Sequence, residues 1–238
     1  MTFFTGNDKA ASPTKNELVE SKRIKVFIVD DHPVVRQGLK LLLQIESDMI
    51  CCGEAETVID ARRGIEATTP DVALIDLSLK DASGLELVKD LHAYHPEIPI
   101  VVLSMHAETL FAERVLKAGA KAYLMKDESQ ESILAAIRKV VAGGLYLSER
   151  MSGRLLSMFL RGSSATNHSL IGQLSDREIE VFEMIGRGIT TREIAGKLNL
   201  SIKTVEAHRE HIKKKMKLTD ATELMQHAIH WVQNERQP

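Results

Sequence analysis

From residue 24 onward, short apolar, β-branched runs alternate with stretches in which apolar residues recur every three or four positions. The short runs are typical of strands and the longer stretches of amphipathic helices. Strands are predicted at Lys25–Val29, Ile50–Ala55, Val72–Ile75, Ile100–Leu103 and Ala122–Met125. Helices are predicted at Pro33–Ile45, Val58–Ala67, Gly84–Tyr94, Glu108–Ala118 and Ser129–Ala142. Because strands that are apolar throughout are buried on both faces, we expect an α/β fold: a doubly wound, five-stranded parallel (βα)5 sheet.

The pattern changes after Gly143–Gly144, which is expected to end the fifth helix. Ser148–Arg161 is helix-like, and residues 162–172 form a polar break rich in Ser, Thr and Asn. Four further helices are predicted at Asp176–Gly186, Thr191–Leu198, Ile202–Lys215 and Ala221–Trp231. The expected organisation is therefore a flexible arm (1–22), an α/β domain (23–145), a linker with a helix (146–172) and a small all-α domain (173–238).

Composition narrows the class of protein. The 238 residues are 44% hydrophobic and 27% charged, which suits globular domains and excludes wholesale disorder, collagen and a coiled coil. No apolar run approaches the roughly 20 residues of a membrane span, and the N-terminal segment lacks the apolar stretch of a signal peptide. We therefore expect a cytoplasmic protein without a membrane partner. The only cysteines, Cys51 and Cys52, are adjacent and are expected to be reduced.

Polar residues follow four of the five predicted strands. They are Asp30 and Asp31 after the first, Asp76 after the third, Ser104 after the fourth and Lys126 after the fifth. The carboxyl ends of parallel strands meet at one rim, where ligands of such sheets bind. Three close carboxylates need a compensating cation, and Mg²⁺ prefers oxygen ligands. We expect a magnesium site with Asp31 and Asp76 as ligands and the backbone carbonyl of Ser78 as a third.

Asp76 is the candidate nucleophile toward phosphorus, because the end of a buried strand holds its carboxylate rigidly. The metal ion and the Lys126 ammonium would neutralise the phosphoryl oxygens, and the Ser104 hydroxyl would donate a hydrogen bond to one of them. Simpler alternatives exist for each residue: Asp31 as a cap of the helix at Pro33, Lys126 as a solvated lysine, Ser104 as a turn hydroxyl. Because all these residues share one rim, we favour the joint site.

Four runs resemble the receiver domain of bacterial two-component response regulators: Val26–Pro33 (VFIVDDHP), Ala73–Leu77 (ALIDL), Val101–His106 (VVLSMH) and Gly119–Asp127 (GAKAYLMKD). The resemblance implies that Asp76 accepts a phosphoryl group from a histidine kinase while Asp30 and Asp31 organise Mg²⁺. It also implies that Lys126 contacts the phosphoryl group, that Ser104 follows it inward and that Tyr123 is the aromatic switch. Without the resemblance, Tyr123 is interpreted as an ordinary core aromatic. The chain departs from the family at Lys80–Asp81–Ala82, where members often carry a proline, which alters the charge and rigidity of the loop over the pocket.

The formal net charge of −2 conceals a basic region in the helical part. Residues 187–217 contain nine Lys or Arg against three Glu, a local excess that suits phosphate binding. Thr191–Leu198, the joint Asn199–Leu200–Ser201 and Ile202–Lys215 have the spacing of a helix-turn-helix. On the second of these helices, Val205, Ile212 and Met216 are expected to face the core. The opposite row consists of Lys203, Glu206, Ala207, Glu210 and Lys214. Alternatively, the lysines at its end form a solvated face that complements the helix dipole.

Further runs resemble the LuxR-type helix-turn-helix: Leu174–Glu178 (LSDRE), Arg192–Leu198 (REIAGKL), Leu200–Ser201 and Thr204–His208 (TVEAH). Together, the two resemblances imply the NarL/FixJ subfamily of response regulators. Ser201 is the expected N-cap of the second helix, where backbone donors would hold a phosphate, and Lys203, Ala207 and Arg209 are candidates for base edges. The predicted DNA-contacting residues are Ser201, Lys203, Thr204, Glu206, Ala207, His208, Arg209, Lys213 and Lys214.

The leading hypothesis is a transcription regulator, not an enzyme, that a sensor histidine kinase phosphorylates at Asp76. Phosphorylation would promote a homodimer that binds double-stranded DNA, because two half-sites multiply the affinity of one small domain. One alternative is a constitutive or ligand-controlled DNA-binding regulator with a vestigial receiver. Another is a metal-dependent phosphatase that uses Asp76 as nucleophile, although Ser78 stands where its second acid would be expected.

Overall fold

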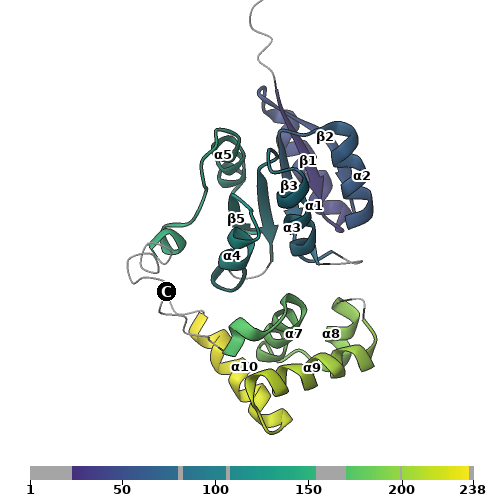
Figure 1. Ribbon diagram of the computed structural model, residues 1–238, viewed down its shortest axis with the longest axis vertical. Helices are drawn as coiled ribbons and strands as arrows, with labels where there is room; N and C mark the ends of the chain where they lie inside the picture. Colours follow the sequence, from purple (N-terminus) through teal and green to yellow (C-terminus); the bar gives the residue numbers. More distant parts are fainter. Residues whose placement is uncertain (1–22, 80–82, 106–107, 154–169, 199, 236–238) are drawn as a thin grey trace, which may run out of the picture.

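The computed structural model describes residues 23–79, 83–105, 108–153, 170–198 and 200–235. Its first part is a five-stranded, all-parallel sheet in the order β2-β1-β3-β4-β5 (Figure 1). The strands are β1 (Ile24–Val29), β2 (Met49–Ala55), β3 (Val72–Asp76), β4 (Ile100–Ser104) and β5 (Ala122–Met125). The helices between and after them are α1 (Pro33–Ile45), α2 (Val58–Thr68), α3 (Gly84–Tyr94), α4 (Glu108–Lys117) and α5 (Gln130–Val141). The predicted doubly wound (βα)5 sheet is confirmed.

Alternate side chains of the strands pack on opposite faces of the sheet, as the two-residue period of a strand requires. Val26 and Ile28 of β1 pack in the cluster that contains the buried residues of α1 and α5. Phe27 and Val29 pack in the cluster that contains those of α2, α3 and α4. The sheet is therefore covered on both faces, and its carboxyl-terminal rim is left for polar groups.

β1 and β2 begin one residue earlier than the apolar pattern predicts, and β3 and β4 end one residue later. β3 includes Asp76, which pairs with Leu103, and β4 includes Ser104, which pairs with Met125. The main-chain ladder does not depend on side-chain polarity, so it continues after the apolar run has ended. Both polar side chains consequently belong to rigid strand positions. At the other end of the chain, the last predicted helix is also longer and reaches Glu235.

The second part is helical, consisting of the short 3-10 helix η1 (Leu170–Gln173) and the helices α7 (Asp176–Gly186), α8 (Thr191–Lys197), α9 (Ile202–Met216) and α10 (Ala221–Glu235) (Figure 1). Sequence signals for helix starts explain these boundaries. Ser175 and Glu178 form a capping box on α7, and Thr190 and Glu193 form one on α8. The Ser201 side chain caps α9 by accepting from the Thr204 amide, as predicted.

Several predictions fall on residues outside the described ranges. Residues 149–153 begin the helix predicted from Ser148, but its remainder and the polar break up to residue 169 lie outside, as do the arm 1–22 and the loop 80–82. Among the described helices, none is long and apolar enough to span a bilayer.

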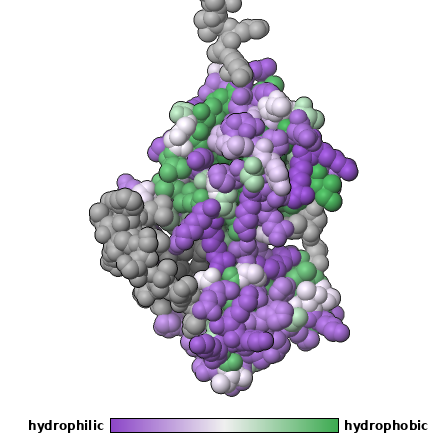
Figure 2. All heavy atoms as spheres, viewed as in Figure 1, coloured by the Kyte–Doolittle hydropathy of each residue, from purple (hydrophilic) through white to green (hydrophobic). Residues whose placement is uncertain are grey.

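The two parts contact each other through α4. The Arg114 guanidinium donates to Asp176 Oδ1 at 3.0 Å and to the backbone oxygens of Ile171 and Gly172 at 3.2 and 3.1 Å. The apolar cluster on the α2–α4 face of the sheet continues into the core of the helical part. In the view of Figure 2, the surface of the helical part is mostly hydrophilic. The two parts are therefore joined at α4, through Arg114 and through the shared apolar cluster.

Gly84 allows α3 to begin directly against the end of β3. A Cβ at this position would lie 2.0 Å from the Asp76 backbone oxygen and 2.7 Å from Leu77 Cα. We expect Gly84→Ala to lower the free energy of unfolding by about 1–3 kcal/mol, the usual cost of overpacking, in urea denaturation. The matched control is Gly38→Ala in α1, where nothing lies within 4 Å. That variant should be neutral or more stable by up to about 1 kcal/mol, and equal losses in both variants would contradict the steric explanation.

Candidate functional site

Three buried carboxylates meet at the carboxyl-terminal rim of the sheet. Asp30 and Asp31 directly follow β1, and Asp76 is the last residue of β3. Their residues are 2%, 5% and 2% exposed. One ligand atom from each of them, together with one from His32, lies within 4.8 Å of the others. The rim residues predicted to form one site are therefore brought together.

Lys126, just after β5, connects two of these carboxylates. Its Nζ lies 2.6 Å from Asp30 Oδ2 and 2.7 Å from Asp76 Oδ2. Its side chain is only 8% exposed, so the alternative of a solvated lysine is wrong. Burial alone lowers the pKa of Lys126, but Asp76 and Asp30 outweigh it and leave that pKa above its ordinary value. The ammonium is thus held in its charged form between the two acids.

The Asp76 carboxylate has a different partner at each of its oxygens. Oδ1 accepts a hydrogen bond from the Ser78 amide at 3.2 Å, while Oδ2 accepts one from Lys126 at 2.7 Å. Burial raises the pKa of Asp76 above its ordinary value; Lys126 opposes this rise, and the neighbouring Asp30 adds to it. The carboxylate is therefore fixed in orientation by the residues around it.

His32 is a member of the rim cluster that the sequence reasoning missed. Its Nδ1 lies 2.6 Å from Asp31 Oδ1 and 3.2 Å from Asp30 Oδ1. His32 occupies the N-cap position of α1 without a side-chain capping bond, so the alternative that Asp31 caps this helix is wrong. The available signal was the position of His32 between two acids and Pro33, which starts the helix.

Ser104 and Tyr123 lie together behind the carboxylates. They are 0% and 2% exposed, and a side-chain hydrogen bond links them. Burial raises the pKa of the Tyr123 hydroxyl, with the bond to Ser104 acting in the opposite direction. The two residues on β4 and β5 that the resemblance implicates in switching are therefore in direct contact.

The donor set fits a divalent cation that prefers oxygen. Three buried carboxylates face a single lysine ammonium, which leaves negative charge that a buried site cannot hold without compensation. Mg²⁺ is normally held by one or two carboxylates and retains several waters. Asp30, Asp31 and Asp76 would hold it, and the ligand role of the Ser78 carbonyl stays a prediction.

The exposed face of α9 is a second candidate site. Val205, Ile212 and Met216 are buried, as predicted for the core-facing side. The residues predicted to face outward are all exposed: Lys203, Glu206, Ala207, Glu210 and Lys214. Ser201 is exposed as well. The contact of the first part with η1 and α7 therefore leaves this row of α9 accessible in the described structure.

Other predicted contact residues on α9 are half-buried: Thr204, His208, Arg209 and Lys213. Lys213 Nζ pairs with Glu210 Oε1 at 2.8 Å. Lys215, which lies outside the exposed row, pairs with Glu178 of α7 at 2.6 Å. Part of the positive charge in this region is therefore already compensated within the domain.

Comparisons with known proteins agree with these two sites. Residues 26–138 match the response regulator receiver domain, and residues 172–228 match the bacterial regulatory proteins of the luxR family. The chain is 33% identical over 210 residues to the oxygen regulatory protein NreC of Staphylococcus carnosus, a match that covers 87% of this chain and 97% of NreC. This chain belongs to the response regulators.

Solved structures show the same fold. This response regulator is 25% identical to RcsB from Salmonella enterica serovar Typhimurium bound to a promoter with a phosphomimetic, with a TM-score of 0.56 over 87% of this chain and 98% of RcsB. A LuxR-family response regulator from Aurantimonas is 27% identical with a TM-score of 0.54, covering 58% of this chain and 99% of that one. The sequence-based assignment to receiver and LuxR-type DNA-binding domains, and hence to transcription regulators, is confirmed.

The excess of negative charge in the pocket leads to a test by metal addition. We expect Mg²⁺ to raise the thermal unfolding midpoint of the wild type, since a ligand at 100 times its dissociation constant stabilises the folded state by about 2.7 kcal/mol. Asp31→Asn should remove most of this effect. Asp127→Asn, which changes an exposed carboxylate next to Lys126, should respond to Mg²⁺ as the wild type does. The same Mg²⁺ response in Asp31→Asn and the wild type would exclude Asp31 from the metal site.

Proposed function

We propose that phosphorylation of Asp76 by a sensor histidine kinase controls DNA binding by this response regulator. The observation that carries the proposal is the buried carboxylate of Asp76 held beside Lys126 and Asp30. In this proposal, residues 23–145 form the receiver domain and residues 173–238 form the DNA-binding domain. Residues 146–172 are the linker between them. The protein acts in the cytoplasm, where the kinase transfers its phosphoryl group and where the DNA is found.

Phosphoryl transfer forms a bond between a carboxylate oxygen of Asp76 and phosphorus as the bond from phosphorus to the kinase imidazole breaks. The imidazole leaves and takes up a proton from solvent. Lys126 neutralises charge on the phosphoryl oxygens, and Ser104 donates its hydroxyl to one of them. Asp30, Asp31 and Asp76 would hold Mg²⁺, which would supply further charge neutralisation at the phosphoryl group.

The change is transmitted through the residues behind the pocket. Ser104 is hydrogen-bonded to Tyr123, so a phosphoryl group that recruits the serine hydroxyl changes the partner of the tyrosine. Both lie on strands that flank α4, whose Arg114 bonds Asp176 and the backbone of η1. A movement of α4 therefore acts on the position of the DNA-binding domain and favours a dimer.

DNA is bound by the N-terminus and the exposed row of α9. Ser201, Lys203, Thr204 and the residues after them would enter the major groove or contact phosphates. Lys203, Ala207 and Arg209 reach base edges, while Glu206 accepts from cytosine amino groups. Ser201, His208, Lys213 and Lys214 contact phosphates and set the register of the helix.

The switch is tested by measuring solution mass with light scattering in Mg²⁺, with and without beryllofluoride as the phosphoryl mimic. We expect a shift from monomer to dimer in the wild type. Asp76→Ala should show no shift, because the mimic binds through that carboxylate. Asp127→Asn is the matched control and should dimerise. Binding of the mimic is checked separately by ¹⁹F NMR.

The outcome decides between the proposal and its alternatives. Bound mimic without a change in mass or in DNA affinity would indicate a vestigial receiver that no longer governs the output. Repeated turnover of a small phosphoester, rather than one phosphoryl group per chain that is hydrolysed slowly, would indicate a phosphatase.

The DNA face is tested by salt dependence. Lys214→Ala should weaken binding to a non-specific duplex and reduce the slope of log affinity against log salt by about 0.9 for each phosphate that the lysine would otherwise neutralise. Lys89→Ala, which removes an exposed lysine from α3, should leave both quantities unchanged. A slope that falls equally in both variants would mean that binding follows total charge and not the face of α9.

A further inference from the structure

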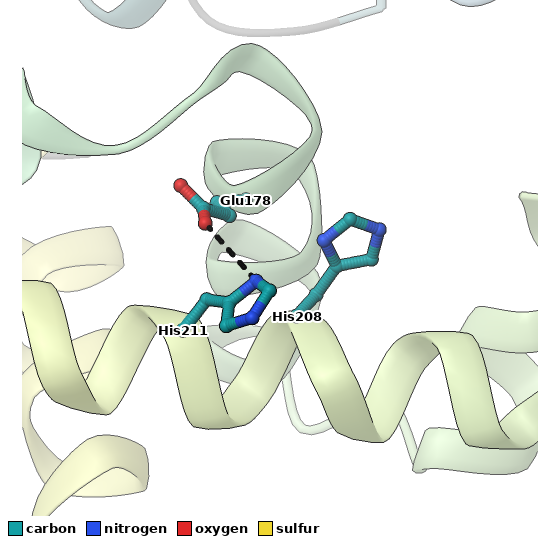
Figure 3. A group of neighbouring side chains, drawn as sticks. All are labelled: Glu178, His208 and His211. Carbon is teal, nitrogen blue, oxygen red and sulfur yellow. Dashed lines mark ion pairs between the residues drawn. The ribbon is translucent and has the colours of Figure 1, made fainter.

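Two histidines of α9 and one glutamate of α7 form a cluster outside both sites described above. Figure 3 shows the rings of His208 and His211 on the side of α9 that faces Glu178. His211 Nδ1 lies 3.9 Å from Glu178 Oε1. One ligand atom from each of the three residues lies within 4.8 Å of the others. The spacing of three residues places both imidazoles on one face of the helix.

The cluster is already close to the geometry of a metal centre. Two ligands at 2.0–2.1 Å from a tetrahedral zinc ion are about 3.4 Å apart, so the gap between His211 and Glu178 has to close by only about half an ångström. The His211 side chain is 64% exposed and has room to turn, whereas Glu178 is 4% exposed and held in place. The rigid carboxylate would fix the site, and the exposed imidazole would complete it.

The two carboxylate oxygens of Glu178 have different neighbours. Oε2 accepts from the Ser175 amide and the Lys215 ammonium, each at 2.6 Å. Oε1 is the oxygen nearest His211 and is the one available to a metal ion. Burial alone raises the pKa of Glu178, but Lys215 and Ser175 outweigh it and hold that pKa below its ordinary value. The bonds to Oε2 therefore hold the carboxylate in place and leave Oε1 on the side of His211.

The ring of His208 is available to a metal ion. Among the described residues, its ring has no hydrogen-bond or ion-pair partner. An imidazole with an available nitrogen suits zinc and similar ions as a ligand.

The geometry points to a zinc site formed by Glu178, His208 and His211, which would link α7 to α9 in the DNA-binding domain. Three protein ligands leave the fourth tetrahedral position to water. The ligand set is rich in imidazole, in contrast to the oxygen-rich magnesium pocket, and so selects a different class of ion. The Lys215 ammonium, 2.6 Å from Glu178 Oε2, repels a cation at the site and should weaken zinc binding.

The test is a competition between the full-length protein and a chromogenic zinc chelator, in excess Mg²⁺ to occupy the receiver pocket. We expect the wild type to bind one zinc ion per chain. His208→Ala and His211→Ala should each weaken binding at least about tenfold, since loss of even an outer-shell partner of a ligand costs about 10- to 100-fold. Circular dichroism and urea denaturation without zinc verify that both variants are folded.

Two controls separate this site from others in the chain. His227 and His230 on α10 have the same spacing of three residues but belong to no metal-ligand cluster among the described residues. The double variant His227→Ala/His230→Ala should bind zinc as the wild type does, and so should His32→Ala in the receiver pocket. If zinc binding is lost in His32→Ala and retained in His208→Ala and His211→Ala, the ion occupies the receiver pocket and the proposal is wrong.

A gain of affinity provides a second, independent readout. Lys215→Gln releases Glu178 Oε2 and removes the nearest positive charge, so it should tighten zinc binding. Lys214→Gln removes the same charge from the adjacent position, whose ammonium forms no ion pair with Glu178 in the described structure. If zinc affinity changed equally in the two variants, it would depend only on the total charge of α9, and the proposed site would be wrong.

Discussion

The receiver pocket depends on a charge imbalance that the fold maintains at one rim of the sheet. Asp30, Asp31 and Asp76 are buried, and the Lys126 ammonium pairs with two of these carboxylates, whereas the Arg36 guanidinium donates to the backbone oxygen of Asp30. Burial in low dielectric makes uncompensated charge costly, so a cation that entered the pocket would be bound favourably. Ser104 on β4 and Tyr123 on the edge strand β5 lie behind these carboxylates and link the pocket to the end of the sheet that α4 covers.

The same packing that buries the pocket connects it to the second domain. α4 packs with Tyr123 in the apolar cluster that continues into the helical part, and Arg114 on its surface binds Asp176. An ion pair of this kind, with each side chain partly exposed, contributes little free energy by itself. Its bonds to the backbone of η1 fix the direction of the Arg114 side chain. The joint between the two parts therefore combines a shared apolar cluster with polar bonds from a single helix, α4.

The sheet, its helices and the helix-turn-helix were predictable from the sequence, because each of these elements is determined by apolar residues that recur at a fixed local spacing. The rim residues were predictable for a related reason: parallel strands bring their carboxyl ends together whatever the loops contain. Boundaries were less predictable. The backbone ladder carries β3 through Asp76 and β4 through Ser104, although both residues end the apolar pattern.

Contacts between distant segments were not predictable from the local pattern of apolar residues. The pairing of Arg114 with Asp176, and of Lys215 with Glu178, joins residues that no local period relates. Pairing of this kind follows from tertiary packing, which a single sequence does not display. His32 is an intermediate case: its neighbours were visible in the sequence, but the turn that directs its ring to Asp31 was not.

α9 illustrates how one helix serves several partners. Its buried row holds the domain together, its exposed row is available to DNA, and a third row carries His208 and His211 toward α7. His208 lies at the border between the last two rows, so the same ring is a candidate for contact with a DNA phosphate and for metal binding. A metal ion bound through one ring nitrogen would fix the orientation of the ring. Through this one side chain, occupancy of the cluster by a metal ion would alter how α9 contacts the DNA backbone, independently of the phosphorylation state of Asp76.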